Sequence, residues 1–294
     1  MPNDIVLSMR NISKSFPGVR ALHNVDFTLK SGEIHALMGE NGAGKSTLIK
    51  VLTGVHPKDS GQITIAGSAK EVNIKPPQEA QNLGISTVYQ EITLCPNLTV
   101  AENMYIGRGN YSFVSWGKMR EKTTELLEKL NIPARATQQL STCSLAVQQM
   151  VAIARAVDMD CKVLILDEPT SSLDEREVEK LFSLMRELKS RGVGIIFITH
   201  FLEQVYEVCD RITVLRNGEL VGAYDIKDLP RVQLISKMMG KELDDITDLK
   251  NSRVSHVRAG TAPVYEAKGL SSAAGTRAVD FKIDQGGVNG FTGL

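Results

Sequence analysis

The chain has 294 residues, of which 42% are hydrophobic and 23% charged, and this composition and length suit a soluble globular protein of one large or two modest domains. Its 34 basic residues equal its 34 acidic residues, which argues against a dedicated nucleic-acid-binding protein. The N-terminus has no apolar core of signal-peptide length, no apolar run is long enough for a membrane helix, and the four cysteines lack zinc-site spacing.

Apolar runs predict the strands in chain order. Residues 25–29 and 63–65 alternate apolar and polar side chains, as half-buried strands do. Four short apolar runs predict buried strands of a parallel sheet, namely EIHALMG (33–39), ISTVYQ (85–90), KVLILDE (162–168) and GIIFITH (194–200). In RITVLRNGELVGAY (211–224), Asn217-Gly218 separates two alternating runs and predicts a hairpin.

Helical patterns lie between these strands. Residues 45–54 and 176–192 each have helical periodicity and end on a glycine, so the alternation of strands and helices predicts an α/β fold. Residues 95–160 have no convincing strand but carry helical patterns at 118–130 and 144–157, which predicts a mostly helical insert. Residues 243–262 are polar without a sustained period, and we interpret them as a linker.

The stretch GENGAGKST has the G-x-x-x-x-G-K-S pattern of a phosphate-binding loop, between a predicted strand and a predicted helix. Its glycines let the backbone point N–H groups at an anion. We expect Lys45 to reach the β- and γ-phosphates, Ser46 to ligate Mg²⁺ and Thr47 to contact the α-phosphate. The alternative is a chance glycine turn, which the strand–loop–helix context disfavours. The predicted nucleotide-binding residues of this loop are Gly39, Glu40, Asn41, Gly42, Ala43, Gly44, Lys45, Ser46 and Thr47.

Other polar residues stand at the carboxyl ends of predicted strands, where ligands bind in such folds. Asp167 fits a carboxylate that holds Mg²⁺ through water, and Glu168 fits a general base for the attacking water. Gln90 could ligate the metal or orient the water, and His200 could reach the γ-phosphate and hold Glu168 in line. Taken singly, these could be a surface acidic pair, a solvated glutamine and a structural histidine.

The order of the P-loop, Gln90, LILDEP, SSLD (171–174) and ITH (198–200) resembles that of ATP-binding-cassette (ABC) ATPases over residues 5 to about 240. Stretches such as GENGAGKSTLIKVLTGV and TVYQEITLCPNLTVAENMYIGR are similar to the ATP-binding subunits of bacterial monosaccharide importers. Among those, VAIARAV, MMGKELD and the stretch from 198 to 222 most resemble galactofuranose importer ATPases.

This resemblance implies a P-loop NTPase cassette with a parallel sheet core, an antiparallel β subdomain and a helical subdomain at about 95–160. It implies that Phe16 stacks on adenine and that Asp174 lies in the loop that communicates between two ATP sites. The implied cofactors are ATP and Mg²⁺. The implied partners are a second cassette, membrane permease subunits and, indirectly, a periplasmic sugar-binding protein, with no nucleic acid. The implied location is the cytoplasmic face of the inner membrane, as a peripheral subunit.

The family's signature helix normally begins Leu-Ser-Gly-Gly-Gln, but here the aligned stretch runs from Cys143 to Val147. Ser144 is kept at a predicted helix N-terminus, where its hydroxyl and nearby N–H groups can bind a γ-phosphate. In the family this helix contacts the ATP of a partner cassette. Both glycines and the glutamine are replaced, which leaves the strength of this composite contact open.

The end of the sequence repeats part of its beginning. VDFKIDQGGVNGFTGL (279–294) and VDFTLKSGEIHALMGE (25–40) both open with Val-Asp-Phe, and both place glycines seven and fourteen residues after that Val. Since importers of this kind carry two cassettes on one chain, we expect one complete cassette at 1–242 and an incomplete second one at 263–294, in a truncated chain. Coincidental similarity of strand pairs is the alternative.

The leading hypothesis is an ATPase that powers a membrane sugar importer, with phosphoryl transfer to water driven by positioning and charge neutralisation. A second hypothesis is a nucleotide-gated binding module with little turnover on its own, which the altered signature motivates. A third is a soluble cassette protein of DNA repair or translation, which the neutral charge disfavours.

Overall fold

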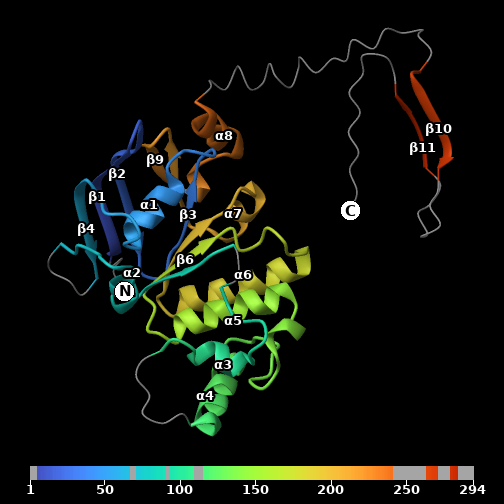
Figure 1. The fold of residues 1–294 in the computed structure, drawn as a ribbon. Helices are drawn as coiled ribbons and strands as arrows, with labels where there is room; N and C mark the ends of the chain where they lie inside the picture. Colours follow the sequence, from blue (N-terminus) through green and yellow to red (C-terminus); the bar gives the residue numbers. More distant parts are fainter. Residues whose placement is uncertain are drawn as a thin grey trace. The chain divides into compact units, whose positions relative to one another are not determined.

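The computed structural model describes residues 5–66, 71–90, 93–108, 115–240, 263–270 and 279–283. The chain divides into two compact units, Met1–Gly240 and Lys241–Leu294 (Figure 1), which are described separately. The first unit contains a six-stranded sheet, a three-stranded sheet and helices α1 to α8.

The six-stranded sheet is the centre of the first unit. Its strands follow the order β5 (Ile85–Val88), β6 (Val163–Asp167), β7 (Gly194–Ile198), β3 (Ile34–Met38), β8 (Arg211–Arg216) and β9 (Glu219–Asp225). Strands β5 to β8 in this order are parallel, and β9 pairs antiparallel with β8 through the predicted Asn-Gly hairpin. The four predicted buried strands and the α/β class are therefore confirmed.

One face of this sheet packs on helix α1 and the three-stranded sheet. Helix α1 (Lys45–Leu52) buries an apolar side against both sheets, in one hydrophobic core. The three-stranded sheet is antiparallel and consists of β2 (Val19–Lys30), β1 (Ile5–Phe16) and β4 (Ser60–Ile65). The short helix α2 (Pro77–Asn82) precedes β5.

The opposite face of the sheet packs on three helices, α5 (Leu145–Val157), α6 (Glu175–Ser190) and α7 (Leu202–Val208). Helix α6 begins at a capping box, in which the Asp174 side chain accepts from the Glu177 amide at 2.8 Å. Its buried side includes Phe182, whose ring contacts that of Phe197 on β7 edge-on at 6.2 Å. The predicted apolar face of this helix is the face that packs on the sheet.

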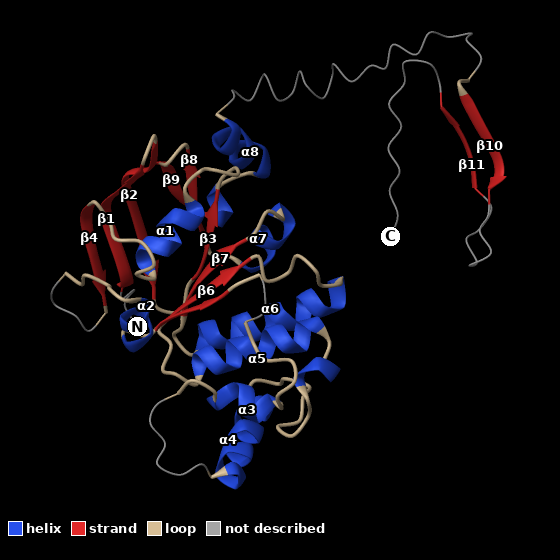
Figure 2. Cartoon of the chain, in the orientation of Figure 1, coloured by secondary structure: helices blue, strands red, loops and turns tan. Residues whose placement is uncertain are grey.

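The predicted helical subdomain is present. It contains α3 (Val100–Tyr105), α4 (Trp116–Lys129), the short 3₁₀ turn η1 (Leu140–Thr142) and α5. Figure 2 shows α3 and α4 on the side of α5 that faces away from the six-stranded sheet. The turn η2 (Ile226–Asp228) and helix α8 (Arg231–Met239) follow β9. Within the described residues, no helix is both long and apolar enough to cross a lipid bilayer.

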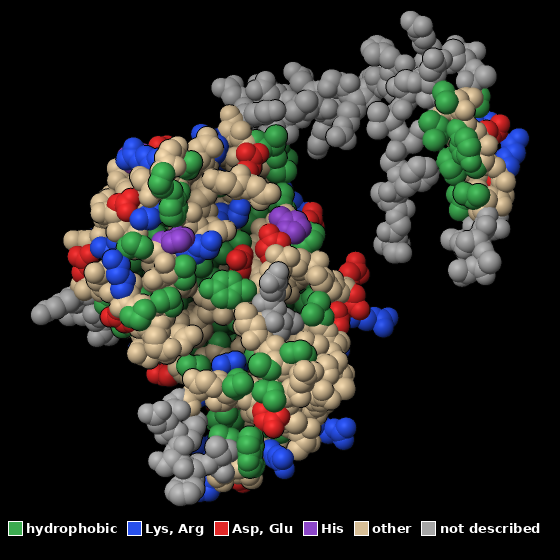
Figure 3. All heavy atoms as spheres, viewed as in Figure 1, with side chains coloured by type: hydrophobic (Ala, Val, Ile, Leu, Met, Phe, Trp, Pro, Cys, Tyr) green, Lys and Arg blue, Asp and Glu red, His purple; other side chains and the backbone are tan. Residues whose placement is uncertain are grey.

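The second unit contains an antiparallel pair, β10 (Tyr265–Leu270) and β11 (Val279–Ile283). Apolar side chains gather on one face of this pair (Figure 3), and Tyr265, Leu270 and Val279 are each at least half exposed. The predicted linker at 243–262 lies outside the described residues.

Candidate functional site

Four parallel strands bring the predicted site residues to one edge of the sheet. The P-loop follows β3, Gln90 follows β5, Asp167 ends β6 with Glu168 directly after it, and His200 follows β7. Because β5, β6, β7 and β3 are parallel neighbours, their carboxyl ends lie side by side. This edge is where open α/β sheets bind ligands.

The P-loop backbone requires glycine at two positions for different reasons. At Gly39, a Cβ atom would lie 2.3 Å from the Leu215 carbonyl oxygen, so a side chain cannot fit there. Gly44 caps α1 with φ of 104°, a left-handed conformation that favours glycine. The loop thus turns into the start of α1, and a glycine-rich loop at a helix N-terminus is the arrangement that binds phosphates.

The Lys45 ammonium group closes the loop by donating to the carbonyl oxygens of Gly39 at 2.7 Å and Glu40 at 3.0 Å. Burial lowers the pKa of Lys45, while the charges of Glu168 and Asp167 oppose that shift. Burial raises the pKa of Asp167, the Glu168 charge adds to the rise, and Lys45 opposes it. The lysine and the two acids thus act on one another electrostatically at the same site.

This donor set suits a hydrated divalent cation and a triphosphate. Ser46, Asp167 and Gln90 supply a hydroxyl, a carboxylate and an amide oxygen, the hard ligands that Mg²⁺ prefers. The Glu168 charge raises the pKa of Asp167, so a cation beside the two carboxylates relieves their repulsion.

Glu168 and His200 are paired directly, since the Nδ1 atom of His200 lies 3.0 Å from Oε2 of Glu168. Glu168 has φ of 48°, which is uncommon for a residue with a side chain, and its amide donates to the Ile198 carbonyl at 2.9 Å. The Glu168 side chain is 30% exposed, so water can reach the carboxylate. The strained backbone and the histidine fix the carboxylate at the strand end.

Phe16 lies at the end of β1, and its ring contacts the His56 ring edge-on at 5.2 Å. The Lys14 ammonium lies 5.5 Å from the centre of the Phe16 ring. Phe16 is 36% exposed, so a flat ligand can reach its side chain. His56 and Lys14 carry no motif of their own, and sequence reasoning did not find them.

Ser144 and Asp174 occupy helix starts away from the P-loop. Ser144 caps α5 and accepts from the Val147 amide at 3.4 Å, and Asp174 caps α6. In the part of the chain that the structure describes, no hydrogen bond or ion pair joins either residue to the P-loop. Leu145, which stands where the family pattern has glycine, is 43% exposed at the start of α5.

The β8–β9 hairpin contacts the P-loop, which the sequence did not predict. The Gly218 amide donates to the Ala43 carbonyl at 3.1 Å, and the His23 amide donates to the Gly218 carbonyl at 2.8 Å. A Cβ atom on Gly218 would lie 2.7 Å from the Ala21 carbonyl oxygen. The dipeptide Asn217-Gly218 signals a turn in the sequence, but nothing in it signals this long-range contact.

Replacing Gly218 by alanine is expected to shift the hairpin away from the P-loop, because the new Cβ cannot fit and φ is 78°. We expect a loss of stability of about 1–3 kcal/mol and a several-fold weaker affinity for ATP. Thermal unfolding and calorimetry measure both. Gly107→Ala is the control, because its φ is 75° but a Cβ there would meet nothing closer than 3.8 Å. Equal effects of the two substitutions would exclude a role for the hairpin contact.

The chain is similar in sequence to ATP-binding proteins of bacterial sugar transporters. The galactofuranose transporter ATP-binding protein YtfR of Escherichia coli (strain K12) is 47% identical over 291 residues, and the alignment covers 98% of this chain and 57% of that protein. The fructose import ATP-binding protein FruK of Bifidobacterium longum is 46% identical over 297 residues, which are 99% of this chain and 57% of FruK. The chain thus spans just over half the length of these relatives.

The solved structures agree on the fold. The ADP conformation of MJ1267, an ATP-binding cassette of an ABC transporter, matches with a TM-score of 0.71 and 25% identity over 83% of this chain and 99% of MJ1267. The family model described as ABC transporter matches residues 22–171, which include the P-loop, Gln90, the signature stretch and Glu168. Since that match covers half of the sequence, the chain belongs to the ABC transporter family.

Proposed function

We propose that this chain binds ATP with Mg²⁺, hydrolyses it, and so powers import of a monosaccharide through a membrane ABC transporter. The observation that carries the proposal is the shared edge of the sheet, at which the P-loop, Lys45, Asp167, Glu168 and His200 meet. A backbone anion site, a lysine, two acids and a water-accessible base are the parts that phosphoryl transfer to water requires.

In this proposal the P-loop N–H groups hold the phosphates, and Lys45 exchanges the Gly39 and Glu40 carbonyls for the β- and γ-phosphates. Ser46, Asp167 and Gln90 would hold Mg²⁺, which would supply positive charge to balance the phosphate oxygens. Glu168 accepts the proton of the attacking water, and His200 keeps the Glu168 carboxylate in place through their 3.0 Å contact.

Ser144 and Asp174 enter this proposal through a second cassette. Ser144 caps α5 and Asp174 caps α6, and among the described residues no hydrogen bond or ion pair joins either of them to the P-loop. We propose that they act on the ATP held by the P-loop of a partner cassette. ATP favours closure of such a pair only if the closed pair contacts it more than the open pair does.

Replacing Phe16 by alanine is expected to weaken ATP binding, because we propose that this partly exposed aromatic side chain stacks on adenine. Base–aromatic stacking contributes about 1–3 kcal/mol, which corresponds to a loss of about 5- to 150-fold in affinity. Calorimetry with ATP measures this loss, and Phe16→Tyr, which keeps the aromatic face, is the control. Unchanged affinity in Phe16→Ala would remove the residue from the adenine site.

We also propose that residues 263–294 begin a second cassette. The register of β10–β11 repeats that of β1–β2, since Phe281 pairs with Ala267 as Phe27 pairs with Met9. In each pair the register shifts between the phenylalanine and the valine of Val-Asp-Phe. At this shift the aspartate of the same motif accepts a hydrogen bond from a backbone N–H of the other strand. These bonds join Gly269 to Asp280 at 2.6 Å and Asn11 to Asp26 at 2.7 Å.

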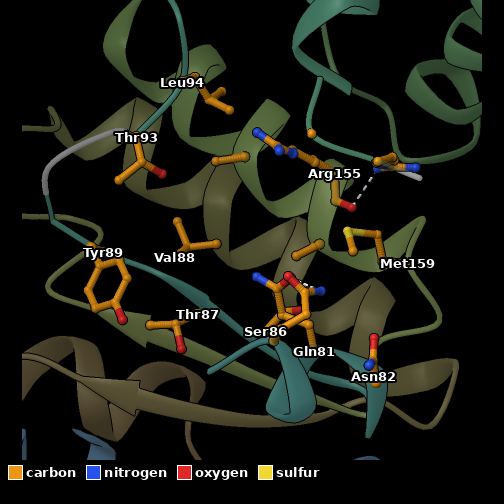
Figure 4. A pocket seen from close by; sticks show the side chains of 15 residues that line it. Gln81, Asn82, Ser86, Thr87, Val88, Tyr89, Thr93, Leu94, Arg155 and Met159 are labelled. Carbon is orange, nitrogen blue, oxygen red and sulfur yellow. Dashed lines mark hydrogen bonds between the residues drawn. The ribbon is translucent and has the colours of Figure 1, made fainter. Parts of the chain in front are cut away.

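A pocket of about 630 Å³ supports an interaction with membrane permease subunits (Figure 4). It lies between β5 with its following loop and helix α5, and its lining includes Gln81, Tyr89, Thr93, Arg155 and Met159. This lining combines polar side chains with Tyr, Arg and Met, the residue types that are enriched at protein–protein interfaces. We propose that permease subunits dock here. Co-purification of those subunits with this chain tests the assignment.

The relatives named for galactofuranose, fructose and ribose import support a monosaccharide as cargo, and galactofuranose is the sugar we propose to test first. The proposed location is the cytoplasmic face of the inner membrane, with a periplasmic sugar-binding protein as an indirect partner. The test is ATP turnover by the assembly in membranes, with a panel of sugars presented by the binding protein. Turnover that rises with one monosaccharide supports the proposal, and turnover indifferent to every sugar contradicts it.

The altered signature favours a second candidate, a nucleotide-gated binding module with little turnover on its own. Leu145 adds bulk at the exposed start of α5, where the family pattern has glycine. Comparison of ATP turnover by this chain with turnover by a two-cassette assembly separates the two candidates. Binding without turnover in both would favour the module.

A further inference from the structure

One buried polar side chain near the catalytic edge has an unsatisfied donor. Gln149 lies on α5, five residues after Ser144, and is only 3% exposed. Its Nε2 atom has no hydrogen-bond partner within the described part of the chain. A buried amide without a partner is costly, so most such groups in proteins bind a neighbour or an ordered water.

A small cavity lies beside this amide. Its volume is about 10 Å³, close to the minimum that holds one water molecule. Besides Gln149, its lining consists of Gln90, Leu145, Glu168, Pro169, Ser171, Ser172 and Leu173. Four of these side chains can exchange hydrogen bonds with a water, which normally needs two to four polar partners.

The segment Glu168–Leu173 connects the proposed catalytic base to α6. Its first residue has the strained φ of 48°, and such a conformation persists only when its surroundings fix it. Thr170 is held on one side, because its hydroxyl donates to Gln204 on α7 at 2.6 Å. The cavity lies between this segment and α5, because residues of both line it.

We propose that Gln149 is a positioning residue, whose amide and one water in this cavity join α5 to the segment Glu168–Leu173. This inference rests on the proposed function. Helix α5 starts at Ser144, the proposed contact with a partner's nucleotide, and Glu168 acts on the nucleotide of its own cassette. Gln149 therefore connects the two ATP sites of a cassette pair. The exposed Leu145 is part of the cavity wall.

The test compares Gln149→Met with Thr123→Val in the assembly with its membrane subunits. Thr123 on α4 is a matched control, because it is 1% exposed and its hydroxyl also has no partner among the described residues. We expect Gln149→Met to lower kcat about tenfold or more, since small misplacements of catalytic groups are costly, while the ATP affinity from calorimetry stays unchanged. Thr123→Val is expected to leave both unchanged.

A purely structural amide would give a different result, because replacing an unpaired buried polar group by an apolar one of similar shape is neutral or stabilising. Normal kcat in Gln149→Met, with an unchanged or raised melting temperature, would therefore overturn the inference. If that variant does not fold, Gln149→Asn, which withdraws the amide by one methylene, takes its place.

A crystal structure of the wild type gives an independent test of the proposed water. Density for a water within about 2.7–3.2 Å of the Gln149 amide nitrogen is expected, and a dry cavity contradicts the inference. Turnover by the wild type that is lost in Glu168→Gln shows that the proposed function holds. In that case normal turnover in Gln149→Met overturns the inference alone, whereas a wild type without turnover overturns the function itself.

Discussion

Replacing Glu168 by glutamine is expected to lower ATP turnover by about 10²–10⁴-fold, the usual contribution of a general base, while ATP binding is retained. The amide keeps the size of the side chain and can still contact His200, which lies 3.0 Å from the carboxylate. It cannot accept the proton of the attacking water. Loss of the Glu168 charge also removes one cause of the raised pKa of Asp167, so the proposed metal ligand should ionise more readily.

Phosphate release by the assembly measures ATP turnover, and calorimetry with ATP measures binding. Glu203→Gln on α7 is the control, because that carboxylate is 75% exposed and is paired with Arg231 on α8. Turnover in Glu168→Gln within twofold of the wild type would exclude Glu168 as the base. Simultaneous loss of turnover and of ATP binding would indicate a structural role instead.

Replacing Lys45 by alanine is expected to weaken ATP binding by about 30-fold or more, because removing one partner of a desolvated charge pair costs at least about 2 kcal/mol. Lys45 is part of the P-loop, and burial already lowers its pKa, so it is poised to exchange backbone carbonyls for phosphate oxygens. Without it, the charges of Asp167 and Glu168 would face the triphosphate with less compensation from side-chain cations.

Equilibrium binding of ATP with Mg²⁺ measures this loss. Lys50→Ala is the matched control, since Lys50 is an exposed lysine in the last turn of the same helix. Melting temperatures are compared as well, because Lys45 also holds the loop through Gly39 and Glu40. An affinity in Lys45→Ala equal to that of Lys50→Ala would exclude the proposed phosphate contact.

Local pattern was sufficient to predict most of the fold. Short apolar runs correspond to β3, β5, β6 and β7 because buried parallel strands are apolar on both faces. The apolar face of α6 could be predicted because the spacing of its apolar residues follows the helical repeat. Site residues at strand ends could be proposed as a group for the same reason, since parallel strands end at one edge.

Contacts between distant segments were not predictable in this way. The Gly218 amide meets Ala43 across the fold, and the sequence around Gly218 signals only a tight turn. Gln149 occupies an ordinary buried position in a helical repeat, and only the fold places its amide beside the Glu168–Leu173 segment. The left-handed conformation of Glu168 is imposed by its surroundings, because a glutamate does not favour it by itself.

The β10–β11 pair illustrates both cases. The repeated Val-Asp-Phe predicted a likeness between the two ends of the chain, and the pairing of Phe281 with Ala267 agrees with it. The matching shift in register at Gly269 could not be predicted from the sequence, because Asn11 and Gly269 are different residues that share only a positive φ. Which strands pair, and where the register shifts, depends on the backbone.

Isothermal titration of ATP into this chain with Mg²⁺ present is the most direct measurement of the central claim, that a triphosphate binds where the P-loop, Lys45 and the two acids meet. We predict saturable heat from a single site per chain, strongly weakened in Lys45→Ala and retained in Glu168→Gln. Absence of binding heat from protein that circular dichroism shows to be folded, or equal binding by Lys45→Ala, would contradict the account.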